Sequence, residues 1–246
     1  MSDDTAMGLA DAEELLATAS FLDCRSLWHS SNYVYLARLC GPDGESFAAI
    51  YKPLAGESPL WDFPEGLYRR EVAAYRFARA LGWDFVPPTV VREGPEGIGS
   101  LQLYVSHDPQ AHFFVQRDHP ELVPQLQRMA VFDFVTNNAD RKGGHCLLDA
   151  KRRIWGIDHG LCFHPQYKLR SVIWDWAGDP IPDEWLAELA TASDALKAGG
   201  ATAESLAELL SPMEIECLVT RANTLLATRR FPAPQGQERH YPWPLV

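Results

Sequence analysis

The sequence predicts an α+β protein with two lobes, a β-rich N-terminal lobe over residues 1–106 and a mainly helical lobe over residues 107–246. Short runs of strand-forming residues, separated by glycine and proline turns, fill the first hundred positions. Beyond Glu121, apolar residues recur at helical spacing. Since a cleft between two lobes is a common ligand site, we expect the functional residues to face one another across this boundary.

The first lobe is expected to be mostly β, with one main helix after a short helical segment near the N-terminus. Gly41-Pro42-Asp43-Gly44 lies between two β-like runs and predicts an antiparallel turn. A second turn at Gly94-Pro95-Glu96-Gly97 has the same character. The expected elements are a helix over 9–19, strands over 33–39 and 47–51, a loop over 53–66, a helix over 67–81, and strands over 86–91 and 100–105.

The second lobe is expected to be helical apart from one small hairpin. The firmest start is Ser211-Pro212-Met213-Glu214, a capping box with proline at the first helical position. The tail over 231–246 is rich in proline and predicts irregular chain. The expected helices begin after residue 121 and extend over 183–197 and 211–229.

Composition limits the classes of partner that this protein is expected to bind. The formal net charge is −11, and an acidic surface repels nucleic acids and anionic membranes. The five cysteines form no C-x-x-C pair, which favours free thiols in a reducing compartment. The first residues lack the apolar core of a signal peptide, and no apolar run is long enough to span a bilayer. We therefore expect a cytoplasmic protein with no nucleic-acid partner and no membrane span.

The strongest chemical signal is the polar segment 137–145, followed by 154–160. Residues 146–148 and 154–157 resemble two short strands around a polar turn, which would place His145 and Asp158 at neighbouring strand ends. Because paired strands lie about 5 Å apart, both side chains could hold one metal ion, with Asp140 nearby. The competing interpretation is that these are ordinary turn and cap residues.

This arrangement suits phosphoryl transfer, in which one acidic residue acts on the attacking hydroxyl and two ligands hold Mg²⁺ on the phosphates. Asp140, His145 and Asp158 keep the order of the Asp, Asn and D-F-G Asp of protein kinases, with His145 in the Asn place. Asp140-Arg141 also resembles the D-R-H opening of phosphatidylinositol 3-/4-kinases, with Lys142 in place of the histidine.

Two residues of the first lobe fit a nucleotide site. Lys52 ends a predicted strand, and kinases use a strand lysine to neutralise the α- and β-phosphates. Glu71 falls on the apolar face of the predicted helix, where an unpaired carboxylate would be costly, so a Lys52–Glu71 ion pair is expected. The alternative is a glutamate that interacts with the first turns of its helix.

The phosphate-covering loop lacks a glycine-rich motif. Ser30, Ser31 and Asn32 stand at the corresponding position before the first hairpin. Hydroxyls and backbone N–H groups of a tight turn can bind phosphate oxygens. An ordinary turn explains these three residues equally well.

Several runs resemble an actinobacterial family described as phosphatidylinositol 3-/4-kinase-like. The similarity covers most of the chain from about residue 30. It implies a kinase-like fold and an ATP site at Lys52, Glu71, Asp140, His145 and Asp158. The runs that carry it are 51–53, 59–64, 70–75, 137–145, 158–164 and 241–244.

The departures from the kinase pattern affect the expected metal preference and the expected catalytic base. An imidazole at His145 makes Mn²⁺ plausible beside Mg²⁺. Lys142 in the histidine place leaves Asp140 as the candidate base, and no A-P-E sequence follows Asp158. We expect an ATP-dependent phosphotransferase acting on a hydroxyl of a protein or small molecule rather than a lipid. A nucleotide-binding regulatory pseudokinase, an AMP-transferring enzyme and, with weaker support, a metal-dependent hydrolase are the alternatives.

Overall fold

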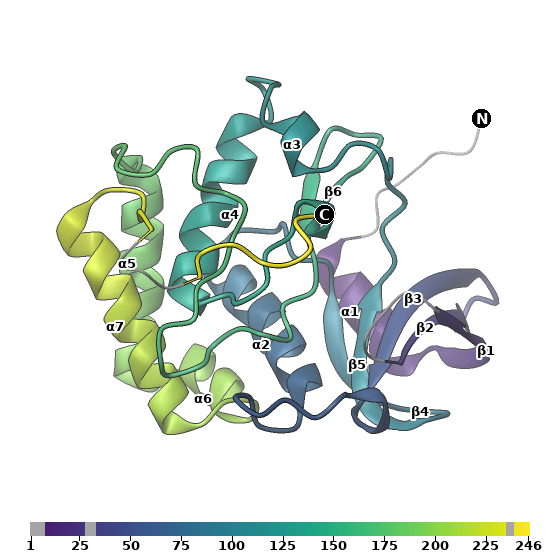
Figure 1. Ribbon diagram of the computed structural model, residues 1–246. Helices are drawn as coiled ribbons and strands as arrows, with labels where there is room; N and C mark the ends of the chain where they lie inside the picture. Colours follow the sequence, from purple (N-terminus) through teal and green to yellow (C-terminus); the bar gives the residue numbers. More distant parts are fainter. Residues whose placement is uncertain (1–7, 28–32, 235–238) are drawn as a thin grey trace. The chain divides into compact units, whose positions relative to one another are not determined.

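The computed structural model describes residues 8–27, 33–234 and 239–246 (Figure 1). It contains two compact units, one made of residues 1–72 and 87–104 and the other of residues 73–86 and 105–246. Ser30, Ser31 and Asn32, the expected phosphate-covering loop, lie outside the described residues. The α+β class is confirmed, since strands dominate the first unit and helices the second.

The first unit is built on a five-stranded antiparallel sheet with the strand order β1-β2-β3-β5-β4. The predicted turn at 41–44 joins β2 to β3, and Gly44 there has a positive φ of 84°, which a residue without Cβ adopts readily. Helix α1 (Leu9–Thr18) packs beside β4 and β5 (Figure 1). The strands are β1 (Ser20–Leu27), β2 (Val34–Cys40), β3 (Ser46–Pro53), β4 (Thr89–Gly94) and β5 (Gly97–Leu103).

Strand β1 was not among the expected elements. It lies at the sheet edge, and its residues alternate only between exposed and half-buried. An edge strand of this kind buries no full apolar face, so its sequence carries a weak periodic signal. The strand expected over 86–91 also begins later, at Thr89, because Pro87 and Pro88 cannot donate ladder hydrogen bonds.

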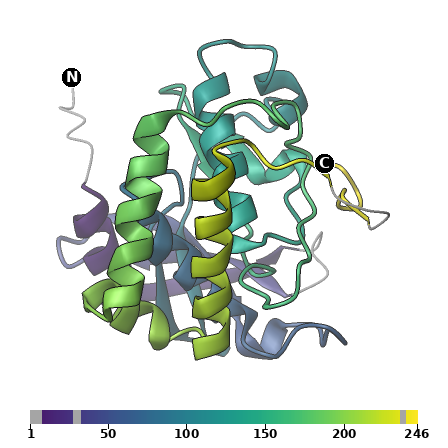
Figure 2. The ribbon, with the colours of Figure 1, turned by 90° about the vertical axis from the view of Figure 1, so that its left-hand side faces the viewer.

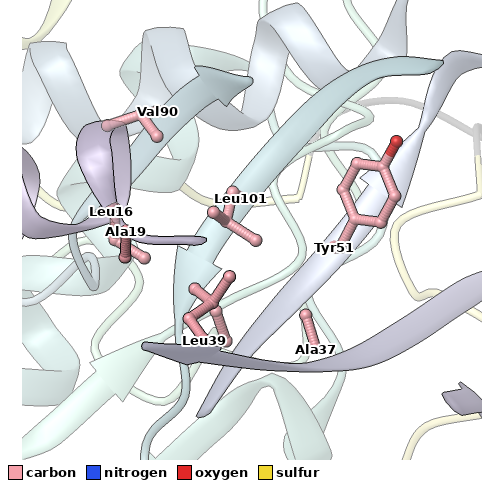
Figure 3. Close-up of a cluster of buried hydrophobic side chains, with 8 residues drawn as sticks. Leu16, Ala19, Ala37, Leu39, Tyr51, Val90 and Leu101 are labelled. Carbon is pink, nitrogen blue, oxygen red and sulfur yellow. The ribbon is translucent and has the colours of Figure 1, made fainter. Parts of the chain in front are cut away.

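The core of the first unit lies between α1 and one face of the sheet (Figure 3). Ala49 and Tyr51 of β3 point into this core. Because side chains alternate along a strand, Lys52 points to the opposite face. The buried residues of this hydrophobic cluster are Leu16, Ala19, Ala37, Leu39, Ala49, Tyr51, Val90 and Leu101.

Helix α2 (Leu67–Ala80) follows a loop that holds one short 3₁₀ turn, η1 (Leu54–Gly56). Its first residues, to Val72, belong to the first unit and the rest to the second. The predicted face of Leu67, Glu71 and Ala74 is buried, and so is most of the rest of the helix. Burial of Glu71 requires a polar partner.

The second unit is mainly helical. Helices α5 and α7 run side by side (Figure 2). Ser211 caps α7 as expected, since Ser211 Oγ accepts from Glu214 N and Ser211 N donates to Glu214 Oε2 at 2.8 Å. The elements are α3 (Phe113–Gln116), α4 (Val123–Thr136), η2 (Gly143–His145), β6 (Cys146–Leu148), β7 (Ile154–Gly156), α5 (Asp183–Ala198), α6 (Ala201–Ala207) and α7 (Pro212–Thr228).

Two features of the second unit differ from or extend the expectation. Helix α6 was not predicted, because its seven residues span too few turns for a periodic pattern. Within 239–246 the tail is irregular, as expected, and it contacts the polar loop: Gly143 N donates to Leu245 O at 2.7 Å. Among the described residues, no helix has the length and apolarity required to cross a membrane.

Candidate active site

The polar loop after α4 is fixed at its start by two buried asparagines. Asn137 adopts a left-handed conformation that ends the helix, with φ 57°. Its side-chain amide donates to the carbonyls of His164 and Gln166 at 2.8 and 2.7 Å, and its oxygen accepts from Lys168 N. Asn138 donates to Asp133 Oδ1 and accepts from the backbone N–H of Asp140. The backbone at Asp140 is therefore fixed by hydrogen bonds from within the unit.

Arg141 and Asp133 form a completely buried ion pair beneath this loop. The guanidinium donates to both carboxylate oxygens, from Nε at 2.8 Å and from Nη2 at 2.9 Å. Burial alone would lower the pKa of Arg141, but the Asp133 carboxylate beside it raises that pKa, so the guanidinium stays charged. From the sequence, Asp133 on the apolar side of its helix was expected either to bind backbone N–H groups of this loop or to be an ordinary polar residue, and its contact with the Arg141 side chain was not predicted.

The same guanidinium joins the loop to the following hairpin. Arg141 Nη1 donates to the carbonyls of His145 and Ile157 at 3.2 and 2.9 Å. Arg141 Nη2 lies 2.7 Å from His159 Nε2, and because guanidinium N–H groups only donate, this ring nitrogen is the acceptor. One buried side chain thus positions both segments that carry the candidate metal ligands.

The hairpin β6–β7 explains why His145 and Asp158 lie together. Cys146 pairs with Gly156, and the ladder extends one step further because Ile157 N donates to His145 O at 3.1 Å. Asp158 then turns out of the strand with a positive φ of 61°. His145 Nε2 lies 3.3 Å from Asp158 Oδ2. The structure therefore brings these two residues together.

Asp140 completes a three-residue cluster. One ligand atom from each of Asp140, His145 and Asp158 lies within 4.8 Å of the other two. Two carboxylates and one imidazole are suitable donors for Mg²⁺ or Mn²⁺, and the imidazole favours the softer ion. All three side chains are partly exposed, so a ligand can reach them. This donor set fits a divalent cation.

Lys142 contributes to the electrostatics of Asp140. Its Nζ lies 2.9 Å from Asp140 Oδ2. Burial nevertheless raises the pKa of the Asp140 carboxyl, because desolvation outweighs the lowering effect of Lys142, and the Asp158 carboxylate raises that pKa further. A carboxylate with a raised pKa is a better proton acceptor than an ordinary one.

From the sequence, Lys168 and Arg170 were candidates to bind a phosphorylated or acidic substrate, with a solvated loop as the favoured interpretation. The structure places the backbone of Arg170 beside the polar loop. Arg170 N donates to Asn138 O, and Arg170 O accepts from Arg141 N. Its charge also acts on the Asp140 carboxyl. No sequence motif indicated this position, because the contact joins segments some thirty residues apart.

In the first unit, Lys52 and Glu71 form an ion pair. Lys52 Nζ lies 2.5 Å from Glu71 Oε1, and the Glu71 side chain is 3% exposed. The Lys52 side chain remains 24% exposed. The structure therefore brings together this second pair of sequence-predicted residues.

Gly99 allows β5 to pass close to β3 beside Lys52. A Cβ on Gly99 would meet the carbonyl oxygen of Lys52 and the backbone of Pro53. Since these are backbone atoms, they cannot rotate away. Glycine is thus required at position 99 for β5 to pass this close to Lys52. From the sequence, Gly99 was only one of several glycines near a turn.

Comparison with known proteins gives one relative that covers most of the chain. No protein-family model matches the sequence. Protein Rv2133c of Mycobacterium tuberculosis is 42% identical over 233 residues, covering 81% of this chain and 83% of that protein. The chain belongs to the Rv2133c family.

Two more distant matches of this Rv2133c-family chain carry the name phosphatidylinositol 4-kinase gamma 4. Phosphatidylinositol 4-kinase gamma 4 of Arabidopsis thaliana is 28% identical over 178 residues, and its namesake in Oryza sativa is 30% identical over 181 residues. These matches cover 54% and 57% of this chain. The chain spans only about a third of the length of either kinase, 31% and 32%.

Solved structures identify the fold of the Rv2133c-family chain as kinase-like. The Helicobacter pylori proinflammatory kinase CtkA matches with a TM-score of 0.53 and 12% identity, over 88% of this chain and 94% of that one. Hydra Fam20 matches with a TM-score of 0.52 and 13% identity, over 92% and 89%. The Golgi casein kinase with Mn/ADP bound gives a TM-score of 0.50 and 13% identity, over 92% and 76%. At such identities the likeness shows the fold alone.

Proposed function

We propose that this chain is an ATP-dependent phosphotransferase, an atypical kinase that moves the γ-phosphoryl group to a hydroxyl acceptor. The observation that carries the proposal is the cluster of Asp140, His145 and Asp158, whose ligand atoms lie within 4.8 Å of one another. These residues follow the order that kinases use for the base and the two metal ligands. The kinase-like fold supports this assignment.

Asp140 is the proposed base. Its carboxylate would accept the proton of the acceptor hydroxyl while the hydroxyl oxygen forms a bond to the γ-phosphorus. The bond between that phosphorus and the β–γ bridging oxygen breaks, and ADP leaves with the electron pair. The raised pKa of Asp140 favours the proton transfer, and Lys142 keeps the carboxylate oriented through its ion pair.

Lys52 is proposed to bind the α- and β-phosphates, with Glu71 holding its side chain in place. The 2.5 Å contact between them supports this role, since Glu71 fixes the ammonium group while the Lys52 side chain stays partly exposed. We propose that residues 1–106 act as the nucleotide-binding lobe and residues 107–246 as the catalytic and metal-binding lobe.

His145 and Asp158 are proposed to hold the metal. A divalent cation bound there would neutralise charge on the β- and γ-phosphate oxygens. The Mn/ADP complex of the Golgi casein kinase, a protein of similar fold, is consistent with this pairing of nucleotide and metal. Ser30, Ser31 and Asn32 remain the candidates for covering the phosphates.

The acceptor is proposed to be a hydroxyl of a protein or a small molecule in the cytoplasm. The net charge of −11 disfavours an anionic membrane surface as the place of reaction. The similarity to phosphatidylinositol 4-kinases covers little more than half of this chain. A match of this extent supports a relationship to atypical kinases more than it supports a lipid as the acceptor. Product analysis distinguishes the alternatives, because an AMP transferase would release pyrophosphate and a pseudokinase would release neither product.

The test of the nucleotide site is calorimetric titration with ATP in the presence of Mg²⁺ or Mn²⁺. The wild-type chain should bind ATP in a metal-dependent manner. Lys52→Met should weaken binding about tenfold to a hundredfold, because it removes a charge-assisted contact with the phosphates. Arg38→Gln removes one positive charge from an exposed position on β2 and should bind as wild type does. Absence of purine-nucleotide binding with either metal would refute the proposal.

The identity of residue 145 should set the metal preference. His145→Asn replaces an imidazole nitrogen with an amide oxygen, a harder ligand. We expect the ratio of Mn²⁺ to Mg²⁺ affinity, measured by titration of the ATP complex, to fall about tenfold. The control is His119→Asn, a histidine with a half-exposed side chain outside the cluster. An unchanged ratio in His145→Asn would exclude His145 as a metal ligand.

A further inference from the structure

A polar pocket lies within the second unit, and none of Asp140, His145 and Asp158 is among its lining residues. It has a volume of about 330 Å³, at the small end of the range for ligand sites. Its lining comes from the turn after α2, from α4 and from the start of β7. The lining residues are Gly82, Trp83, Asp84, Phe85, Gln125, Arg128, Arg153 and Ile154.

Arg128 is held in this pocket by two indole rings. Its guanidinium carbon lies 5.6 Å from the centroid of Trp83 and 5.0 Å from that of Trp185. The Trp83 ring is itself fixed, because its Nε1 donates to Glu188 Oε2 at 2.6 Å. Stacking holds an arginine through its faces and leaves the N–H groups at its edge to bind a ligand.

The buried donors of this cage lack acceptors. Arg128 Nε and Trp185 Nε1 are both buried and have no hydrogen-bond partner among the described residues. Buried polar groups without partners are rare, because each one costs the free energy of its lost hydration. The two donors belong to side chains that pack against each other.

The charges around the pocket favour an anion. Arg153 is the second arginine of the lining, and its guanidinium carbon lies 3.8 Å from the centroid of the Trp155 ring. Asp84 is the acidic residue of the lining; its carboxylate pairs with Arg79 at 2.6 Å, and its backbone carbonyl accepts from Arg153 Nη2. Two arginines therefore face this pocket in a chain whose overall charge is −11.

We propose that this pocket binds a compact oxyanion, a phosphate or carboxylate group of a small metabolite, through Arg128 and Arg153. Guanidinium groups present several N–H donors that match such groups in a bidentate manner. The proposal stands on this pocket alone and does not depend on the phosphotransferase activity. It assigns a ligand site on α4, the helix that also carries Asp133.

The test is calorimetric titration of the full chain with inorganic phosphate and, separately, with succinate, at constant ionic strength. We expect saturable binding of at least one anion, and the stronger of the two identifies the ligand group. Arg128→Gln should weaken binding about tenfold or more, and Arg153→Gln should also weaken it. The control Arg38→Gln makes the same change of charge in the first unit and should leave the affinity unchanged.

Two further measurements separate this pocket from the proposed nucleotide site. The anion affinity should persist in Lys52→Met. The indole N–H signal of Trp185, assigned by its loss in Trp185→Phe, should shift when the anion binds wild type. No saturable binding of either anion, or wild-type affinity in folded Arg128→Gln and Arg153→Gln, would overturn the proposal.

Discussion

Asp158→Asn is expected to lower ATP turnover by roughly a thousandfold, which corresponds to about 4 kcal/mol of transition-state stabilisation. The substitution removes the negative charge of a proposed metal ligand while keeping its size. Asparagine also tolerates the left-handed backbone at this position, where φ is 61°, so the fold should be unaffected. The measurement is the rate of ADP formation at saturating Mg²⁺ or Mn²⁺.

The matched control for this prediction is Asp194→Asn. Asp194 lies on α5 with its side chain 76% exposed, paired with Lys197. Its replacement makes the same change of charge and should leave turnover within about twofold of wild type, since isolated surface pairs contribute little. If Asp158→Asn and Asp194→Asn gave equal rates, Asp158 would have no role in catalysis.

Arg141→Met is expected to cost about 3–5 kcal/mol of the free energy of unfolding. It leaves the carboxylate of Asp133 buried without the guanidinium that neutralises it, and it removes the bonds to the carbonyls of His145 and Ile157. Arg141→Lys should also destabilise, because an ammonium group cannot reproduce the bidentate contact. Urea denaturation measures both effects.

Two comparisons make this prediction specific. Arg38→Met breaks the exposed pair with Asp23 and should cost at most about 1 kcal/mol. The double variant Asp133→Leu/Arg141→Met removes both buried charges and should be more stable than Arg141→Met alone. Equal stability of Arg141→Met and Arg38→Met would show that the buried pair does not hold the loop.

Much of the candidate site follows from local sequence patterns. Because strand side chains alternate and a short hairpin pairs its ends, His145 and Asp158 were expected at neighbouring strand ends, and they lie 3.3 Å apart. Because an apolar helix face excludes an unpaired carboxylate, Glu71 indicated a partner, and Lys52 lies 2.5 Å from it. The roles of these residues in catalysis stay predictions until the experiments above are done.

Other features depend on contacts between distant segments. The edge strand β1 and the short helix α6 carry too little periodicity to be recognised from sequence. Arg170 looked like a loop residue until the structure placed its backbone beside Asn138 and Arg141. Asp133 was expected either to bind backbone N–H groups or to occupy an ordinary polar position, and instead it binds the side chains of Arg141 and Asn138.

Local sequence patterns predict the α+β class, the hairpin that joins His145 to Asp158, and the kinase-like order of the acidic residues. Each of these depends on neighbours within one or two elements, where periodicity and turn chemistry act directly. The complete burial of Arg141 and its hydrogen bonds to the carbonyls of His145 and Ile157 depend instead on long-range packing. Burial depends on what every other segment packs against, and no local pattern encodes it.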